Sequence, residues 1–385
     1  MANLMDYLDW RGGIPLDRVP LNEVDALILA TLCYNRMGDR IGGDAGLPLR
    51  ELAPLVPPLP PEANIYYKKR REMMLKMAAT ERFGGICLRN YVDILDRGRS
   101  MQFSAVTIDL PDGTAYVAFR GTDSTLVGWR EDFMMSYETP VNAQEAAAVY
   151  LMQAAEKHHG PLMCGGHSKG GNLAAWAAAK ASAPVRRRLR AVYSFDGPGL
   201  DEETAASEGY REILPVLRSL VPQSSVVGML LAYHENYEVV RADSAFIWQH
   251  NVFSWEVLGG SLVRNGELTQ GAGVIQRAVQ DWIEHYDRAE RKLMVETVFR
   301  VLAASGAQTI GDLKADLLGS ALRMLEESHE LRKDQRDKVL GMLAGLVKSG
   351  SDSFLRDLSD KSRTALEALG GMVAGYLKDL GGRKD

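Results

Sequence analysis

Hydrophobic and polar residues alternate along two neighbouring segments near residue 110, and this alternation predicts a β-hairpin. Residues 103–108 and 114–119 carry apolar side chains at about every second position, and Pro111-Asp112-Gly113 supplies a turn between them. Short apolar runs predict further strands at residues 160–164, 190–195 and 225–231. Longer segments with helical composition predict helices at residues 22–36, 62–82, 91–96, 143–158, 172–180 and 209–220.

Strands that alternate with helices predict a mostly parallel sheet and therefore an α/β domain. From about Ala272 the pattern changes to four or five amphipathic helices with no strand signal. We therefore predict an α/β domain over residues 1–265, with a helical insert at about 45–100, and an all-α C-terminal extension over residues 266–385. Apolar residues recur at helical spacing in that extension, at Val295, Val298, Phe299, Leu302, Leu313, Leu317, Leu318 and Leu325.

Composition narrows the class of protein. Hydrophobic residues make up 46% of the chain and charged residues 25%, which is usual for a globular protein, and the net charge of −5 argues against a nucleic-acid surface. The basic run Lys68-Lys69-Arg70-Arg71 is expected to be a solvated helix face. The three cysteines are widely spaced and predict neither disulfides nor a metal site. No signal peptide and no membrane-spanning run is apparent, so a cytoplasmic location is expected.

One pentapeptide carries the clearest chemistry. Gly166-His167-Ser168-Lys169-Gly170 fits the G-x-S-x-G nucleophile elbow, in which a tight turn between a strand and a helix exposes the serine hydroxyl. Such a turn brings backbone against backbone, so the positions two before and two after the serine need glycine. The apolar run before the motif and the Ala-rich segment after it supply the strand and the helix. A glycine-rich turn with no catalytic role is the alternative.

A nucleophilic Ser168 needs a base and an orienting acid, which follow the serine in an α/β-hydrolase. His250 lies in a loop-like stretch after the last predicted strand and is favoured as the base over His234. The side chain of His167 is expected to point away from its neighbour Ser168. Asp196 begins a tight turn at the end of a predicted strand and is the candidate acid, with Asp243 as the alternative.

The developing oxyanion needs two convergent N–H groups. One is expected from Lys169, directly after the nucleophile. The other is expected from Thr122, which follows the second hairpin strand, where Gly121 allows a close approach of the backbone. An ordinary turn at the end of a strand is the alternative at Gly121-Thr122.

These motifs resemble class 3 (fungal-type) lipases, which share the Gly-His-Ser-x-Gly-Gly elbow and a Phe-Arg-Gly-Thr segment followed by Trp and Asp. Here the matching residues are 119–122, Trp129 and Asp132. The chain is also similar to a bacterial family of lipase-like α/β-hydrolases of unknown function. Residues 166–174, 195–199, 221–229 and 249–250 carry that similarity, which covers about residues 20–260.

The chain departs from the lipase pattern at two places. Class 3 lipases usually place the acid after the strand that follows, but residues 224–228 contain no carboxylate, which favours Asp196 one strand earlier. Lys169 replaces the usual Leu after the nucleophile and is expected to leave a charge near the pocket mouth.

The sequence therefore predicts a serine hydrolase that cleaves carboxylic esters of lipids or other acylated small molecules through Ser168, His250 and Asp196. No metal or organic cofactor is expected. A thioesterase or amidase would use the same chemistry, and a non-catalytic scaffold whose C-terminal helices bind a protein partner is the alternative from another class. The Pro-rich and apolar segment at 45–80 is expected to be either a lid or inert packing.

Overall fold

The computed structural model describes residues 1–61, 63–225, 227–229, 237–244, 246–269, 272, 285–309 and 312. The chain forms two compact units. Unit 1 comprises Met1–Asp123 and Glu138–His285, and unit 2 comprises Ser124–Tyr137 together with Tyr286–Asp385. The predicted domain boundary at 265 lies within unit 1 and stays a prediction.

An eight-stranded sheet organises unit 1, and its strands follow one another in sequence order from β1 to β8. Neighbours from β1 to β4 are antiparallel, and neighbours from β4 to β8 are parallel. The strands are β1 (Leu47–Pro48), β2 (Cys87–Asp96), β3 (Met101–Asp109), β4 (Ala115–Phe119), β5 (Leu162–His167), β6 (Leu189–Phe195), β7 (Leu217–Pro222) and β8 (Tyr237–Val240). A separate antiparallel pair is formed by β9 (Val257–Leu258) and β10 (Ser261–Leu262).

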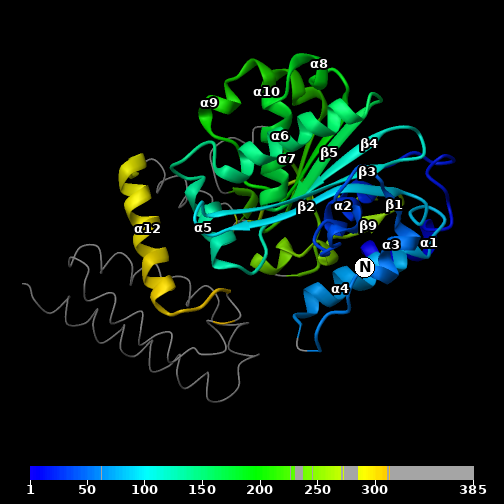
Figure 1. Ribbon diagram of the computed structural model, residues 1–385, viewed down its shortest axis with the longest axis horizontal. Helices are drawn as coiled ribbons and strands as arrows, with labels where there is room; N and C mark the ends of the chain where they lie inside the picture. The colour runs from blue at the N-terminus through cyan, green and yellow to red at the C-terminus, as the bar shows by residue number, and fades with distance from the viewer. Residues whose placement is uncertain are drawn as a thin grey trace, which may run out of the picture. The chain divides into compact units, whose positions relative to one another are not determined.

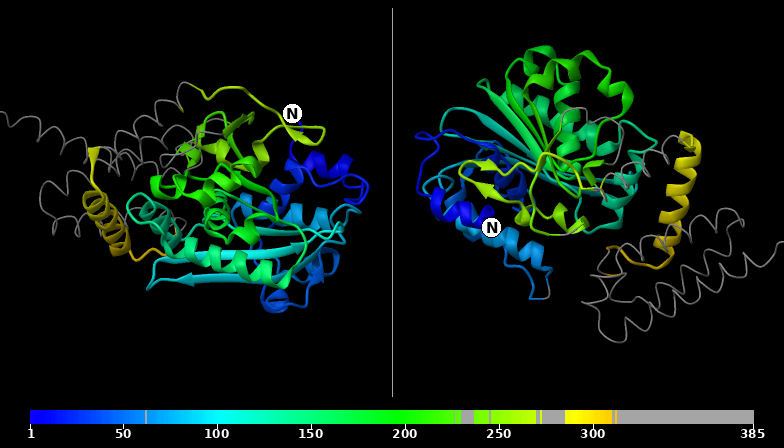
Figure 2. Two further views of the ribbon diagram at one scale, coloured as in Figure 1. Left: turned by 90° about the horizontal axis from the view of Figure 1, so that it is seen from above. Right: turned by 180° about the vertical axis from the view of Figure 1, so that it is seen from behind.

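Helices cover both faces of this sheet, and this is the α/β-hydrolase architecture that the sequence predicts. One face packs against α6 (Asn142–Lys157), α7 (Lys169–Lys180) and α10 (Glu208–Ile213), and the other packs against α1 (Leu4–Arg11), α2 (Glu23–Leu32) and α4 (Ile65–Ala78) (Figure 1). The blue N-terminal helices and the green helices lie on opposite sides of the strands (Figure 2, right). Shorter helices are α3 (Leu49–Leu52), α8 (Ala183–Arg186) and α9 (Glu202–Ala205).

Alternation along the hairpin explains the two cores. Val106 and Ile108 of β3 pack with the N-terminal helices, whereas Phe103 and Ala105 pack with α6 and α7. Successive side chains of a strand point to opposite faces, so a strand with apolar residues on both faces is buried on both. The hairpin is therefore confirmed. Burial of each of its large apolar side chains stabilises the folded state by about 1.5–3 kcal/mol.

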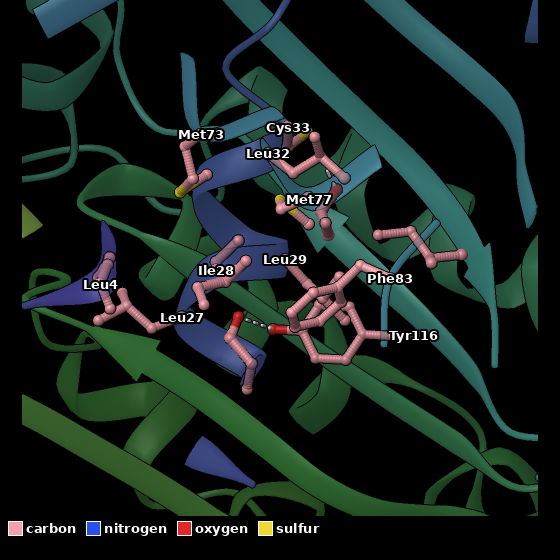
Figure 3. Packing of buried hydrophobic residues seen from close by; sticks show 14 of the residues in the cluster. Leu4, Leu27, Ile28, Leu29, Leu32, Cys33, Met73, Met77, Phe83 and Tyr116 are labelled. Carbon is pink, nitrogen blue, oxygen red and sulfur yellow. Dashed lines mark hydrogen bonds between the residues drawn. The ribbon is translucent and has the colours of Figure 1, made fainter. Parts of the chain in front are cut away.

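The helix α2 is buried along almost its whole length. Asn22 caps its first turn by accepting hydrogen bonds from Val24 N and Asp25 N, and Asp25 reaches back to the Asn22 amide in a capping box. Its apolar residues pack with the methionines of α4 and with Tyr116 of β4, whose hydroxyl donates to the carbonyl of Ala26 at 3.1 Å (Figure 3).

Two element predictions are wrong. Residues 91–96 form the end of β2 rather than a helix, and a bulge between Arg89 and Val92 disturbs the alternation that marks a strand. The helix predicted over 209–220 ends at Ile213, because Pro215 cannot continue it, and residues 217–222 are β7.

The strand predicted near 225–231 is also wrong over the part that the structure describes. Residues Val227–Met229 form a short 3₁₀ turn, η4, and the parallel strand that precedes this turn is β7. Residues 226, 230 and 231 lie outside the described residues.

Unit 2 contains α5 (Leu126–Met134) and α12 (Arg288–Ala304). The rings of Phe133 and Phe299 lie 5.9 Å apart, and Leu126 N donates to the carbonyl of Gln308 at 3.0 Å. Trp129 and Asp132, which carry part of the resemblance to lipases, belong to α5. The helices predicted beyond residue 312 lie outside the described residues. No helix in the described part of the chain is long and apolar enough to span a bilayer.

Candidate active site

Ser168 stands at the sharp turn between β5 and α7. Its backbone is in a rarely populated conformation, with φ 61° and ψ −136°. Two hydrogen bonds hold this conformation: Ser168 N donates to the carbonyl of Phe195 at 2.9 Å, and Gly171 N donates to the carbonyl of Ser168 at 2.8 Å. The strand, turn and helix that a nucleophile elbow requires are confirmed, and the strain of the turn is concentrated at the serine.

Glycines make this turn possible. A Cβ atom at Gly170 would lie 2.2 Å from the carbonyl oxygen of Phe119, and one at Gly166 would lie 2.2 Å from the carbonyl carbon of Gly170. Both distances are far inside van der Waals contact and involve backbone atoms. The elbow therefore tolerates no side chain at either position.

Asp196 is the residue directly after β6, the strand next to β5. It has φ 48° and is buried, and its amide donates to the carbonyl of Leu220 at 2.8 Å. Carboxyl ends of adjacent parallel strands meet at one edge of the sheet, which brings Asp196 and Ser168 to the same edge.

Asp196 and His250 form a pair. His250 Nδ1 lies 2.6 Å from Asp196 Oδ2, and the imidazole keeps 27% of its surface exposed while the carboxylate is fully buried. The other oxygen, Oδ1, accepts hydrogen bonds from the Ser225 hydroxyl and from Gly228 N. With Nδ1 committed to the carboxylate, Nε2 is the nitrogen of His250 left to exchange protons with a substrate.

The alternative acid does not occupy this arrangement. Asp243 is exposed and its side chain accepts from the hydroxyl of the adjacent Ser244. His234 lies outside the described residues.

Side-chain amides anchor the segment that carries His250, which ends the 3₁₀ turn η5 (Phe246–His250). Gln249 Oε1 accepts from Ser224 N at 2.7 Å, and Gln249 Nε2 donates to the carbonyl of Ser244 at 2.7 Å. The carbonyl of Gln249 accepts from Trp255 Nε1 at 2.8 Å. These bonds tie the loop after β8 to the end of β7, so the imidazole is positioned by the fold.

His167 provides a second anchor that the sequence does not reveal. Its Nε2 donates to the carbonyl of His250 at 2.8 Å, so Nδ1 carries the lone pair that faces the Tyr34 hydroxyl at 3.0 Å. The rings of His167 and His250 lie 4.5 Å apart. Burial, followed by the nearby His250 and Arg70, lowers the pKa of His167 well below its usual value of 6.5. His167 is therefore a neutral support for the His250 backbone.

The two segments expected to bind the oxyanion meet next to Ser168. Lys169 is the first residue of α7, so its amide is at a helix N-terminus. Gly121, which precedes Thr122, approaches so closely that a Cβ atom there would lie 2.9 Å from Ser168 Cβ and 2.4 Å from the carbonyl oxygen of His167. Donation from these amides to a substrate stays a prediction.

The expected charge of Lys169 at the pocket mouth is wrong. Its side chain is buried, and Nζ donates to the carbonyl of Gln102 in β3 at 2.8 Å. The ammonium is therefore used to bridge α7 and the sheet beneath the elbow.

Metal-ligating clusters are absent from the described residues: no three or more His, Cys, Asp or Glu side chains are placed to hold an ion. The three cysteines are free thiols. Burial raises the pKa of Cys33 and of Cys164 to about 12, so both are in the neutral form.

A family model for Mbeg1-like proteins matches residues 77–300, more than half of the chain, and this span contains the elbow, Asp196 and His250. The chain belongs to the Mbeg1-like family. The match to this family does not extend to α1, α2 or the first half of the predicted insert. A search of curated proteins finds no match.

Solved structures that are similar include three lipase structures, all at low similarity. The Rhizomucor miehei lipase propeptide complex has 18% identity and a TM-score of 0.29, over 41% of this chain and 57% of that one. The M37 lipase has 15% identity and a TM-score of 0.34, over 55% of this chain and 70% of that one. The lipase from Rhizopus microsporus var. chinensis has 15% identity and a TM-score of 0.33, over 57% of this chain and 76% of that one. The chain thus spans little more than half of the Rhizomucor structure.

Proposed function

We propose that this Mbeg1-like chain is a serine hydrolase that cleaves carboxylic esters through an acyl-enzyme. The observation that carries the proposal is the 2.6 Å contact between His250 Nδ1 and the buried carboxylate of Asp196, at the strand edge where Ser168 stands in a strained elbow. A carboxylate that orients an imidazole for proton transfer from a serine hydroxyl is the arrangement that activates serine.

In the proposed reaction, Ser168 Oγ attacks the acyl carbon while His250 Nε2 takes the hydroxyl proton. Asp196 holds the imidazole by its Nδ1–H and stabilises the imidazolium. The amides of Thr122 and Lys169 donate to the oxyanion. When the tetrahedral intermediate collapses, His250 gives its proton to the oxygen of the departing alcohol.

The second half returns the enzyme to its starting state. Water attacks the acyl carbon and loses a proton to His250 Nε2. The intermediate then releases the carboxylic acid as Ser168 Oγ recovers its proton. Each step needs only water and the side chains and backbone amides named here, so the proposed chemistry requires no organic cofactor.

Labelling with a fluorophosphonate probe tests the nucleophile. The folded protein should be labelled, and Ser168→Ala should abolish the labelling. Ser182→Ala is a matched control, because Ser182 starts α8 without making a capping hydrogen bond. Failure to label well-folded protein would favour the non-catalytic scaffold. A series of p-nitrophenyl esters from acetate to palmitate, with matched thioesters, then separates an esterase from a thioesterase.

A further inference from the structure

The basic run on α4 is not one solvated face, because its four cations have different surroundings. Lys68 Nζ donates to the carbonyl of Pro61 at 2.6 Å, and Arg71 donates to the carbonyls of Val56 and Pro57. Lys69 is exposed, with Nζ 6.0 Å from the centre of the Phe253 ring, three residues after His250. Arg70 and Arg71 are half-buried, and Arg70 lies over the ring of Tyr34.

Helical spacing fixes the direction of Arg70. Met73, Met74 and Met77 are fully buried, and they follow Arg70 by three, four and seven residues. Residues at those intervals share one face of a helix. Arg70 therefore extends the buried stripe of α4 towards the edge of the sheet that carries Ser168 and Asp196. Met73 and Met77 lie against Leu32 and Cys33, at the end of α2 next to Tyr34 (Figure 3).

Arg70 stacks on the residue that supports the site. Its guanidinium carbon lies 3.8 Å from the centre of the Tyr34 ring. The Tyr34 hydroxyl in turn contacts His167 Nδ1 at 3.0 Å, and a Cβ atom at Gly121 would lie 2.2 Å from it. One aromatic ring therefore separates the guanidinium from the elbow and the predicted oxyanion site.

Within the part of the chain that the structure describes, Arg70 has neither a carboxylate partner nor a hydrogen bond. Its Nε is buried and unpaired. Arg120 repels it and is itself paired with Asp93 at 2.8 Å. Burial lowers the pKa of Arg70 from its usual value, although a guanidinium stays charged at neutral pH. Arg70 as a whole is half-buried, so its charge has lost part of its water without gaining a partner, and an arriving anion would offset that cost.

We propose that Arg70 is an anion-binding residue for the substrate, and that the natural ester carries a carboxylate or phosphate group close to the bond that is cleaved. Stacking on Tyr34 fixes the plane of the guanidinium and leaves its edge for bidentate pairing with an oxyanion. Lys69, the preceding residue on the same helix, adds a second positive charge 6.0 Å from the ring of Phe253. The kinetic part of this inference rests on the proposed ester hydrolysis.

Paired substrates test it kinetically. One pair is a 1-acylglycerol 3-phosphate and the 1-acylglycerol of equal chain length, which differ by a phosphate on the leaving alcohol. The other is the mono-p-nitrophenyl ester of a dicarboxylic acid and the p-nitrophenyl ester of the matching fatty acid, which differ by a carboxylate on the acyl chain. Arg70→Gln should lower kcat/KM for the anionic member of at least one pair about 10- to 100-fold, with less than about a threefold change for its neutral member.

Control variants separate binding from packing. Arg71→Gln removes a neighbouring charge and should leave both members of each pair unchanged. Arg70→Lys keeps the charge and should recover part of the preference, even if Arg70→Gln folds poorly. Equal losses on neutral and anionic esters would assign Arg70 a packing role and overturn the proposal, as would no loss on either. The pair that responds places the anion on the alcohol or on the acyl chain.

A binding measurement does not depend on turnover. Ser168→Ala should bind the 1-acylglycerol 3-phosphate or the dicarboxylate monoester more tightly than the neutral partner, and adding Arg70→Gln should remove that difference. Such binding by a protein that hydrolyses no ester would contradict the hydrolase proposal and leave the anion site standing. Hydrolysis of neutral esters with no Arg70-dependent binding of either anion would support the hydrolase proposal and contradict the anion site.

Discussion

Ser225 donates a hydrogen bond to Asp196 Oδ1, the carboxylate oxygen that His250 does not use. The amide of Gly228 donates to the same oxygen at 3.2 Å. Both donors belong to residues 224–228, the segment in which class 3 lipases usually place the acid itself. Here that segment has no carboxylate, and it supplies hydrogen-bond donors to Asp196, the predicted acid, which follows the neighbouring strand.

Substitution of the acid should separate the two candidates. Asp196→Asn should lower kcat on a p-nitrophenyl ester by about 10³- to 10⁴-fold, because the amide no longer stabilises the imidazolium or fixes its tautomer. Asp243→Asn, at an exposed position, should stay within about twofold of the unaltered protein. A large loss with Asp243→Asn alone would assign the acid to Asp243.

Removal of the supporting hydroxyl should have a smaller effect. Ser225→Ala deletes one donor to a fully buried carboxylate but leaves the Gly228 amide in place. We expect kcat to fall about tenfold with KM nearly constant, since the acid is loosened rather than lost. Steady-state kinetics on the same ester measure both constants. A rise in KM without a change in kcat would count against a positioning role for Ser225.

The contact between Gly121 and the elbow should also be sensitive. Gly121→Ala would place Cβ 2.2 Å from the Tyr34 hydroxyl and 2.4 Å from the carbonyl oxygen of His167, so the backbone around Ser168 must shift. We expect kcat to fall at least 10²-fold, because a displaced oxyanion donor loses most of its effect. Gly43→Ala is the control, since a Cβ atom there meets nothing within 4 Å. Equal activities of the two variants would argue against an oxyanion site beside Gly121.

Local sequence patterns were sufficient to predict the hairpin and the elbow around the site. The alternation of the hairpin and the glycines of the elbow both describe neighbours in sequence, and such neighbours largely decide strands and turns. The strand β2 was missed because a bulge shifts its alternation at Arg89, and β7 was missed because its apolar residues continue a helical segment past Pro215.

Local sequence patterns could not predict the residues that support the site. Tyr34 and His167 are separated by 133 residues, and Ser225 and Asp196 by 29. Contacts of this kind exist only after the sheet has formed, so no spacing in the sequence announces them. Arg70 differs, because its helical spacing is visible in the sequence: the basic run suggests solvent, whereas its position three residues before Met73 places it next to the buried face of α4.

A buried ion pair should dominate the stability of the N-terminal helices. Arg82 and Asp25 are almost fully buried and doubly hydrogen bonded, and the Tyr7 hydroxyl donates to Asp25 Oδ1 at 2.8 Å. Arg82→Met should lower the free energy of unfolding by about 3–5 kcal/mol, because it leaves the carboxylate buried without its partner. Arg190→Ala breaks a half-exposed pair and should cost at most about 1 kcal/mol in the same urea titration. Equal costs would contradict this distinction.

Acid should destabilise the fold through His167. Its folded pKa lies well below 6.5, the usual value that the unfolded chain regains, so the unfolded state binds a proton on acidification before the folded state does. The contribution of His167 is therefore complete above pH 6.5 and is lost as the pH falls towards the folded pKa, by about 1.4 kcal/mol between pH 7.5 and pH 5.5. His167→Gln keeps a donor for the His250 carbonyl but does not titrate. Between pH 7.5 and pH 5.5 its free energy of unfolding should therefore fall by about 1.4 kcal/mol less than that of the unaltered protein. Urea titrations at the two pH values measure the difference, in which titrating groups that do not interact with His167 cancel. An identical loss of unfolding free energy in the two proteins would mean that His167 takes up its proton in the folded state, and the neutral form assigned to it would then be wrong.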